Sequence, residues 1–257
     1  METPLLNVQG LTHRYGNRAA CANISFDLYG GEVLAVVGES GSGKTTLLRC
    51  LSGQLRPDAG SVRFETRTQG AVDIWAISDA SRRMLTRTDW GFVHQNPRDG
   101  LRADVSAGAN IGERLMAVGA RHYGNIRREA RAWMNKVELD ARRIDESPAT
   151  YSGGMQQRLQ IARNLVSRPR LVFMDEPTAG LDVSVQARLL DLLRGLASDL
   201  GLSAIIVTHD LAVARLLAHR TLVMNAGRVV EAGLTDQVLD DPQHAYTQLL
   251  VSSALPA

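Results

Sequence analysis

The apolar residues of the chain form short runs that are separated by stretches with helical periodicity. Three runs, residues 33–37, 171–174 and 204–207, are continuously apolar, which is typical of strands buried on both faces. Strands of this kind alternate with helices in parallel sheets, because each parallel connection needs a crossover. The pattern therefore predicts an α/β fold with a central parallel sheet.

A different pattern near the N-terminus predicts antiparallel strands. Residues 5–28 and 60–74 alternate apolar and polar positions, as in Ser61-Val62-Arg63-Phe64. Such alternation is typical of strands with one solvated face. We expect a small antiparallel β-subdomain formed within about residues 5–75.

The middle of the chain carries no buried-strand signal. Between residues 96 and 151 the pattern instead gives two helical candidates, at 107–119 and 125–137. We expect a helical subdomain here, extending to about residue 165 with the helix that follows.

The composition indicates a globular protein without a strongly charged partner. The 257 residues are 44% hydrophobic and carry 29 basic and 27 acidic side chains, a net charge of +2. This balance gives no strong attraction toward nucleic acid or an anionic membrane. We therefore expect no nucleic acid among the partners.

Cysteine usage and hydropathy favour the cytoplasm. Cys21 and Cys50 are far apart and belong to no C-x-x-C or Cys/His cluster, so neither a disulfide framework nor a zinc site is indicated. No apolar run approaches the roughly 20 residues needed to cross a bilayer, and residues 1–10 lack a secretion signal. We expect a cytoplasmic protein without direct membrane insertion.

The strongest motif lies between the first buried strand and a helix expected at residues 46–51. It matches G-x-x-x-x-G-K-[ST], in which glycines let backbone N–H groups surround phosphates and the helix N-terminus adds positive charge. Lys44 can reach the β and γ phosphates, and Thr45 can offer its hydroxyl to Mg²⁺. A tight glycine turn is the alternative, but Lys44 is one of only two lysines in an arginine-rich chain, which favours phosphate binding. The motif comprises Gly38, Glu39, Ser40, Gly41, Ser42, Gly43, Lys44 and Thr45.

The strand expected at residues 171–174 ends in two carboxylates, Asp175 and Glu176. Ligands of open α/β sheets gather at the carboxyl ends of strands, which places both acids beside the phosphate loop. Asp175 suits a Mg²⁺ shell, and Glu176 could polarise an attacking water as general base. An Asp-Glu pair can also be a turn or a helix cap, but the phosphate loop favours the catalytic interpretation.

A second glycine-rich helix start follows at Ser152-Gly153-Gly154-Met155-Gln156. Ser152 could be an ordinary N-cap, with the glycines forming the turn. Two helix starts suited to phosphate, of which only one has a lysine, suggest that the second addresses a different nucleotide or the far side of the same one.

These motifs, with the later Thr208-His209-Asp210, stand in the order found in ABC-type nucleotide-binding domains, and the chain resembles that family over nearly its whole length. The resemblance implies a P-loop NTPase fold, with a RecA-like parallel sheet core, an antiparallel β-subdomain and an α-helical subdomain. It also implies a single domain of residues 1–257, with a C-terminal tail at about 240–257. ATP and Mg²⁺ are the implied cofactors.

Further roles are carried over by position. Tyr15 resembles the aromatic that stacks on adenine, Gln95 the residue that senses Mg²⁺ and the water, Asp182 a dimer contact, and His209 the histidine that contacts the γ-phosphate. Taken singly, Tyr15 could be a half-buried aromatic, and Gln95 or His209 an ordinary polar side chain. The implied catalytic residues are Glu176, His209 and Gln95, the metal site is Thr45, Gln95 and Asp175, and the nucleotide contacts are Tyr15, Gly38, Glu39, Ser40, Gly41, Ser42, Gly43, Lys44, Thr45, Thr46, Ser152, Gly153, Gly154, Met155, Gln156 and Asp182. Because each motif occurs once, the resemblance implies a head-to-tail homodimer in which each phosphate loop faces the partner's signature, residues 152–156.

Departures from the commonest family sequence suggest a branch. Tyr151 and Met155 replace the usual leucine and glutamine of the signature, which resembles the peptide-importer branch, as does the tail at residues 244–250. Residues 112–116, 119–124 and 182–194 look closer still to the ABC-type subunit of bacterial carbon-phosphorus lyase systems. That resemblance implies docking on the subunits of a soluble core complex that cleaves phosphonates.

Two segments near Gln95 bear on the partner. Residues 96–101 differ from the Asp-Pro-x-x-Ser-Leu-Asn-Pro type of segment by which peptide importers couple to permeases. Arg82, Arg83 and Arg87, with Met84, Leu85 and Trp90 beside them, could dock an acidic protein surface; a solvated helix is the equal alternative.

Three functional hypotheses remain open. The chain could be an ATPase accessory to a phosphonate-cleaving complex, the motor of a peptide-type importer with an ABC permease as partner, or a scaffold that binds ATP but hardly hydrolyses it.

Overall fold

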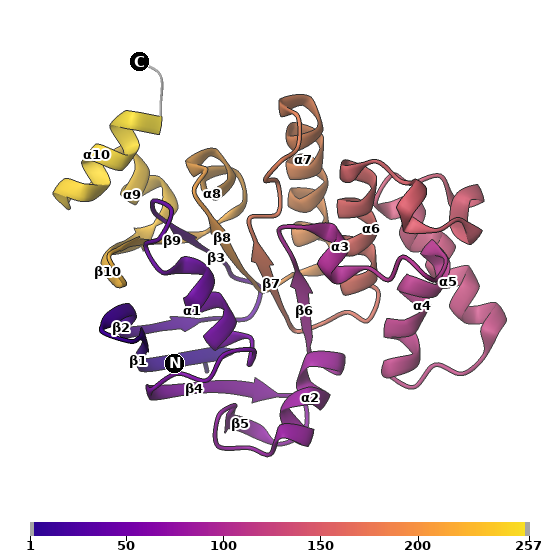
Figure 1. Ribbon diagram of the computed structural model, residues 1–257, viewed down its shortest axis with the longest axis horizontal. Coiled ribbons are helices and arrows are strands. Elements are labelled where there is room, and N and C mark those ends of the chain that lie inside the picture. The colour runs from indigo at the N-terminus through magenta and orange to yellow at the C-terminus, as the bar shows by residue number, and fades with distance from the viewer. Residues whose placement is uncertain (1–2, 255–257) are drawn as a thin grey trace.

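The computed structural model describes residues 3–254, which form two sheets and a group of helices (Figure 1). The larger sheet is parallel except for the pairing of β10 with β9. The three strands expected from continuous apolar runs are confirmed as β3, β7 and β8, and all are fully buried. The strand order is β10 (Arg228–Leu234), β9 (Arg220–Asn225), β3 (Val33–Val37), β8 (Ala204–Thr208), β7 (Leu171–Asp175) and β6 (Trp90–Val93).

The smaller sheet is the antiparallel β-subdomain that the alternating pattern predicts. Val62 and Phe64 are buried on one face, whereas Arg63 between them is exposed. The sheet runs in the order β2 (Arg18–Leu28), β1 (Leu6–Tyr15), β4 (Ala59–Thr66) and β5 (Gly70–Asp73).

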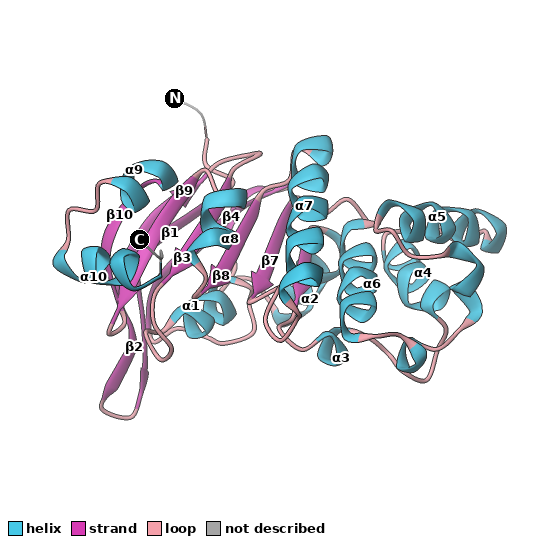
Figure 2. Cartoon of the chain, turned by 90° about the horizontal axis from the view of Figure 1, so that it is seen from above, coloured by secondary structure: helices cyan, strands magenta, loops and turns pink. Residues whose placement is uncertain are grey.

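The helical subdomain lies to one side of both sheets (Figure 2). Its longer helices begin at side-chain caps: Ser106, His122 and Ser152 each accept a hydrogen bond from a backbone N–H three residues ahead. The segment contains α3 (Pro97–Gly100), α4 (Ala107–Ala117), α5 (Tyr123–Lys136), two 3₁₀ turns (Ala141–Asp145 and Pro148–Thr150) and α6 (Gly153–Leu165).

The two faces of the large sheet pack against different layers. Phe173 and Ile205 face a core shared with α1 and the antiparallel sheet, whereas Met174 and Ile206 face a core shared with α6 and α7. The remaining helices are α1 (Lys44–Leu51), α2 (Asp79–Thr88), α7 (Val183–Leu200), α8 (Leu211–Leu217), α9 (Thr235–Asp240) and α10 (Ala245–Ala254). The expected tail at 240–257 thus contains α10, and its residues 255–257, like residues 1–2, lie outside the described part.

The structure corrects the expected docking face on residues 81–90. Leu85 and Trp90 are buried, and Trp90 belongs to β6 rather than to the basic helix. Arg82 is held within the chain, because its guanidinium pairs with Asp79 and stacks on Trp75 with 4.7 Å to the ring centroid. Of the three arginines, only Arg83 and Arg87 remain exposed.

Candidate functional site

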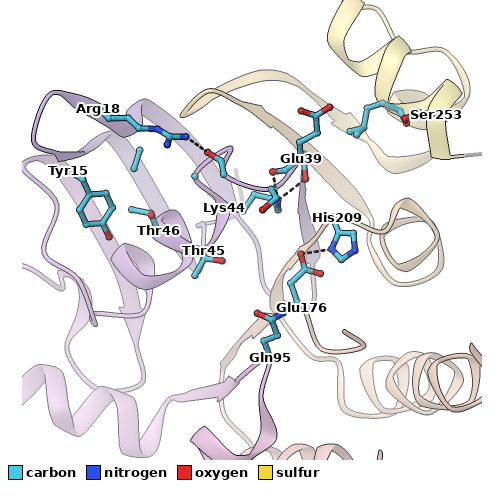
Figure 3. Close-up of a pocket in the computed structure, with 16 residues that line it drawn as sticks. Tyr15, Arg18, Glu39, Lys44, Thr45, Thr46, Gln95, Glu176, His209 and Ser253 are labelled. Atoms are coloured by element: carbon cyan, nitrogen blue, oxygen red, sulfur yellow. Dashed lines mark hydrogen bonds and ion pairs between the residues drawn. The ribbon is translucent and has the colours of Figure 1, made fainter. Parts of the chain in front are cut away.

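The phosphate-loop motif connects β3 to α1 and lines a pocket of about 830 Å³ (Figure 3). Two of its glycines have φ angles in the left-handed region and touch backbone. A Cβ on Gly43 would meet the carbonyl oxygen of Ala20 at 1.9 Å, and one on Gly38 would meet that of Met224 at 2.2 Å. The loop therefore keeps its shape only with glycine at both positions.

Lys44 is the first residue of α1, and its side chain turns back under the loop. The Nζ atom donates hydrogen bonds to the carbonyl oxygens of Gly38 and Glu39 at 2.7 and 2.9 Å. Burial lowers the pKa of Lys44, while the charges of Glu176 and Asp175 act against that shift. The loop thus holds a buried ammonium beside two carboxylates.

Thr45, which lines the pocket, and the buried Asp175 behind it bring two oxygens together. The Thr45 hydroxyl donates to Asp175 Oδ1 at 3.1 Å. Burial raises the pKa of the Asp175 carboxyl, and the hydrogen bond from Thr45 partly opposes this. A hydroxyl and a carboxylate are the hard oxygen donors that Mg²⁺ prefers, and phosphate oxygens commonly complete its shell. These residues therefore fit a magnesium site, although the described residues hold no group of three or more Asp, Glu, His or Cys side chains arranged for a metal.

Glu176 and His209 are joined by a hydrogen bond at the edge of the same pocket. His209 Nδ1 lies 2.9 Å from Glu176 Oε1, and the side chains are 65% and 13% exposed. Glu176 has a φ of 45°, an uncommon conformation for a residue with a side chain. Strained backbone of this kind persists where surrounding bonds fix it, and here the Glu176 N–H donates to the Val207 carbonyl.

Sheet order explains why these residues meet. The strands β6, β7, β8 and β3 are neighbours, and their carboxyl ends lead to Gln95, Glu176, His209 and the phosphate loop respectively. All four contribute to the lining of the pocket. This convergence at the carboxyl edge is what the parallel sheet predicted.

The opposite side of the pocket comes from the antiparallel sheet. Tyr15, at the end of β1, lines the pocket with 54% of its surface exposed and contacts His13 edge-on. Thr46 also lines the pocket, on α1. An exposed aromatic face beside a phosphate loop can stack on a base.

Four residues that line the pocket escaped the sequence analysis: Arg18, Ala20, Leu250 and Ser253. Arg18 donates from its guanidinium to the Gly41 carbonyl at 3.0 Å, and its place three residues after Tyr15 was the one available signal. The Tyr246 hydroxyl accepts a hydrogen bond from the Glu39 N–H at 3.0 Å, and Leu250 and Ser253 follow it on α10. No sequence pattern indicated that α10 reaches the loop.

The second motif, residues 152–156, does not line this pocket. Ser152 and Gly153 are exposed at the start of α6, where the Ser152 hydroxyl accepts from the Met155 N–H at 3.4 Å. Met155 is partly buried against Arg143. Gly154 lies close to α7, since a Cβ on it would meet Val185 at 2.7 Å.

Besides that motif, the predicted residues Ser42, Asp175 and Asp182 are also not among the residues that line the pocket. Gln156 points inward: its amide donates to the carbonyl oxygens of Pro148 and Tyr151, and 6% of the residue is exposed. The structure therefore removes the Gln156 side chain from the candidate nucleotide contacts. Asp182 is exposed just before α7, and its side chain makes no capping bond.

None of the helices within residues 3–254 combines the length and apolar character needed to cross a bilayer. The buried cysteines Cys21 and Cys50 are both free thiols, as their spacing predicted.

Comparison with known proteins agrees with this site. The family model described as ABC transporter matches residues 21–179. A protein of Escherichia coli (strain K12) named as the phosphonates utilization ATP-binding protein PhnK is 65% identical, covering 99% of each chain. A protein of Brucella ovis named as a peptide import ATP-binding protein is 36% identical, covering all of this chain and 80% of the relative.

Solved structures show the same fold. An ATP-binding cassette in a dimeric post-hydrolysis state with ADP and Pi matches with a TM-score of 0.79 at 28% identity, covering 90% of this chain and 98% of that one. The cbiO1 protein of Clostridium perfringens, part of the ABC transporter complex cbiONQ, gives the same score and identity, covering 93% and 92%. The phosphate loop, the sheet order and these matches together show that the chain belongs to the ABC transporter family of ATP-binding proteins and is an ATPase with the α/β P-loop fold.

Proposed function

We propose that two copies of this chain bind two ATP molecules with Mg²⁺ in a head-to-tail dimer, and that hydrolysis drives a rearrangement of a partner complex. One observation carries the dimer. The pocket of a single chain contains the phosphate loop, Glu176 and His209, whereas Ser152 and Gly153 lie exposed outside it on an uncovered helix start. A partner chain placed head to tail would bring these donors to the open side of the ATP.

In this mechanism the protein does most of its work by positioning and by charge. The amides around Gly41 and Gly43 and the Lys44 ammonium hold the phosphates, and Tyr15 stacks on the adenine. Glu176 accepts the proton of the attacking water, and His209 holds the γ-phosphate. Bound Mg²⁺, with Thr45, Asp175 and Gln95 as its protein ligands, would neutralise charge on the β and γ phosphates.

The two chains separate again after hydrolysis. The γ-phosphate lies between the phosphate loop of one chain and the signature helix of the other, with Asp182 at the same interface. Cleavage removes this bridge, so the attraction between the chains falls and the dimer opens.

Replacing Glu176 by Gln tests this proposal. Glu176→Gln keeps the shape of the side chain but removes its basicity, so we expect ATP to bind and hydrolysis to fall by about 100-fold or more. The closed dimer should then accumulate with Mg-ATP and be seen by size-exclusion chromatography with light scattering. Glu129→Gln, an exposed position on α5, is the matched control. Phosphate release by Glu176→Gln at the wild-type rate would show that another group is the base. Negligible release by the wild-type chain itself would favour the ATP-binding scaffold.

The partner we propose is the core complex of a carbon-phosphorus lyase in phosphonate catabolism, in the cytoplasm. The 65% identity to the Escherichia coli phosphonates utilization protein supports this choice. The exposed basic side chains Arg83 and Arg87 on α2 suit an acidic docking surface. Arg83→Glu with Arg87→Glu should abolish co-purification with the core complex while ATP hydrolysis by the isolated chain stays unchanged. Undiminished co-purification of the double variant would exclude this docking face.

A motor for peptide import is the second candidate, because the Brucella relatives named for peptide import align with the entire chain. Fractionation of the native host separates the two. An importer motor follows its permease into the membrane fraction, whereas the lyase accessory stays with the core complex.

A further inference from the structure

One face of α6 carries three buried amide side chains that point at the outer edge of β6. They are Gln157, Gln160 and Asn164, and they are 2%, 0% and 6% exposed. Within residues 3–254, β6 is the last strand of its sheet and pairs only with β7, so its outer backbone groups have no strand partner there. Buried edge groups of this kind need other hydrogen-bond partners.

The amides supply those partners at alternate residues of the strand and its continuation. Asn164 Oδ1 accepts from the Phe92 N–H at 3.0 Å, and Gln160 Oε1 accepts from the His94 N–H at 2.6 Å. The Gln160 amide nitrogen also donates to the His94 carbonyl at 3.2 Å. Both backbone groups of His94 are therefore held by the single side chain of Gln160.

The spacing explains why a helix can replace a strand here. Two strand residues advance about 6.6 Å, and four helix residues advance about 6.0 Å, so the pairs at 92 and 94 match those at 164 and 160. Gly91 and Gly100 permit the close approach: a Cβ on Gly91 would lie 3.3 Å from Asn164 Cβ, and one on Gly100 would meet Gln160 Oε1 at 2.4 Å.

Gln157 orients the central amide. Its Oε1 accepts from the Gln160 amide nitrogen at 3.1 Å, and its own nitrogen donates to the His94 carbonyl at 3.4 Å. The connection between helix and strand is therefore made by hydrogen bonds between uncharged amide and backbone groups, which salt does not weaken.

His94 directly precedes Gln95, the pocket residue on this side, and α6 starts with the exposed motif at Ser152. We propose that Gln160 is a positioning residue: it clamps the backbone of His94 to α6, so that Gln95 takes its place in the pocket only when the signature helix is seated. The clamp lies about 10 Å along the helix from Gly153, and a helix transmits a displacement over that distance as a rigid rod. Binding of the partner's ATP at Ser152 is in this way coupled to Gln95 in the chain's own site, which rests on the dimer and the Gln95 role proposed above.

Hydrogen exchange of the nucleotide-free chain tests the clamp itself. Gln160→Met keeps the side-chain length but removes both hydrogen bonds, so exchange in a peptide spanning residues 93–96 should quicken by about tenfold or more, because the His94 N–H loses its acceptor. Asn164→Leu is the matched control on the same helix face. It should quicken exchange of the Phe92 N–H and leave exchange of the His94 N–H unchanged. Gln157→Met removes only the amide that orients Gln160, so exchange in the same peptide should quicken by less than in Gln160→Met. If Gln160→Met does not fold, the exchange rate of Gln157→Met tests the clamp in its place. Unchanged exchange in the folded variant would overturn the proposal.

The Mg²⁺ dependence of ATP hydrolysis tests the consequence. Gln160→Met should raise the Mg²⁺ concentration for half-maximal hydrolysis several-fold, in the same direction as Gln95→Ala, whereas Asn164→Leu should stay within twofold of wild type despite a similar loss in melting temperature. If Gln95→Ala shifts the Mg²⁺ requirement and Gln160→Met does not, the positioning role is wrong. If Gln95→Ala itself leaves the requirement unchanged, the proposed role of Gln95 fails, and the exchange result still decides whether the clamp exists.

Discussion

The phosphate loop offers a sharp test, because two of its glycines differ in what surrounds them. Gly41 and Gly43 both have φ in the left-handed region, at 80° and 107°. The nearest atom to a Cβ on Gly41 is the Arg18 guanidinium nitrogen at 3.6 Å, an ordinary contact, whereas a Cβ on Gly43 would lie 1.9 Å from the Ala20 carbonyl oxygen. Alanine is therefore strained at the first position and excluded at the second.

The expected magnitudes follow from these contacts. In Gly41→Ala the alanine disfavours the left-handed conformation by about 1–2 kcal/mol. If the free loop relaxes, ATP binding must return it to that conformation, which weakens ATP affinity by at most about 5- to 30-fold. For Gly43→Ala, Cβ atoms are essentially never found under 3.0 Å from such an atom, so the loop or β2 must shift by about 1.1 Å. A misplacement of about 1 Å can slow a catalysed reaction by about 100-fold. We expect a similar factor for the loss of ATP affinity when the phosphate loop shifts by that distance.

The assay is titration with a fluorescent ATP analogue, with thermal melting followed by circular dichroism to show that both variants are folded. Gly43→Ala should bind ATP about 3- to 20-fold more weakly than Gly41→Ala. If the two folded variants bind ATP within threefold of each other, the contact between the loop and β2 does not determine the shape of the phosphate site, and the reasoning is refuted.

Two further predictions concern other parts of the chain. Tyr246→Phe should lower the free energy of unfolding by about 1 kcal/mol, because the Glu39 N–H loses its acceptor. Leu249→Ala, on the exposed side of α10, should change it little. Chemical denaturation measures both values, and equal losses would contradict a stabilising role for the Tyr246 hydrogen bond. Burial raises the pKa of the Cys21 and Cys50 thiols from 9.0 to about 12, so the stability that comes from keeping them protonated is complete below pH 9 and is lost as the pH rises toward 12. Iodoacetamide at pH 9 should therefore leave the folded chain unmodified and label both thiols in urea; labelling of the folded chain would disprove this.

The central strands and motifs could be predicted because their information is local. Val33–Val37 is apolar throughout, and the spacing of Gly38, Gly43 and Lys44 encodes the loop without reference to distant residues. The convergence of Glu176 and His209 followed from the rule that parallel strands deliver their carboxyl ends to one edge.

What could not be predicted depends on long-range contacts. The strand β6 has four residues, and its edge is completed by side chains of α6 some 70 positions later, so it carried no pattern of its own. The inward turn of Gln156 is set by the carbonyl groups of Pro148 and Tyr151, which a motif does not reveal. The contact between Tyr246 and Glu39 joins residues 207 positions apart.

The position of β3 in the sheet has a consequence for the order in which the protein can be made. This strand ends at Val37, yet its neighbours are β8 and β9, at 204–208 and 220–225. A nascent chain emerging from the ribosome thus exposes an entirely apolar strand, and the phosphate loop attached to it, until about 170 further residues have been synthesised. During that time the apolar strand has no native pairing partner and is open to aggregation or to chaperones. The nucleotide pocket is consequently completed late in translation, because its lining includes His209, which follows β8, and Leu250 and Ser253 on α10.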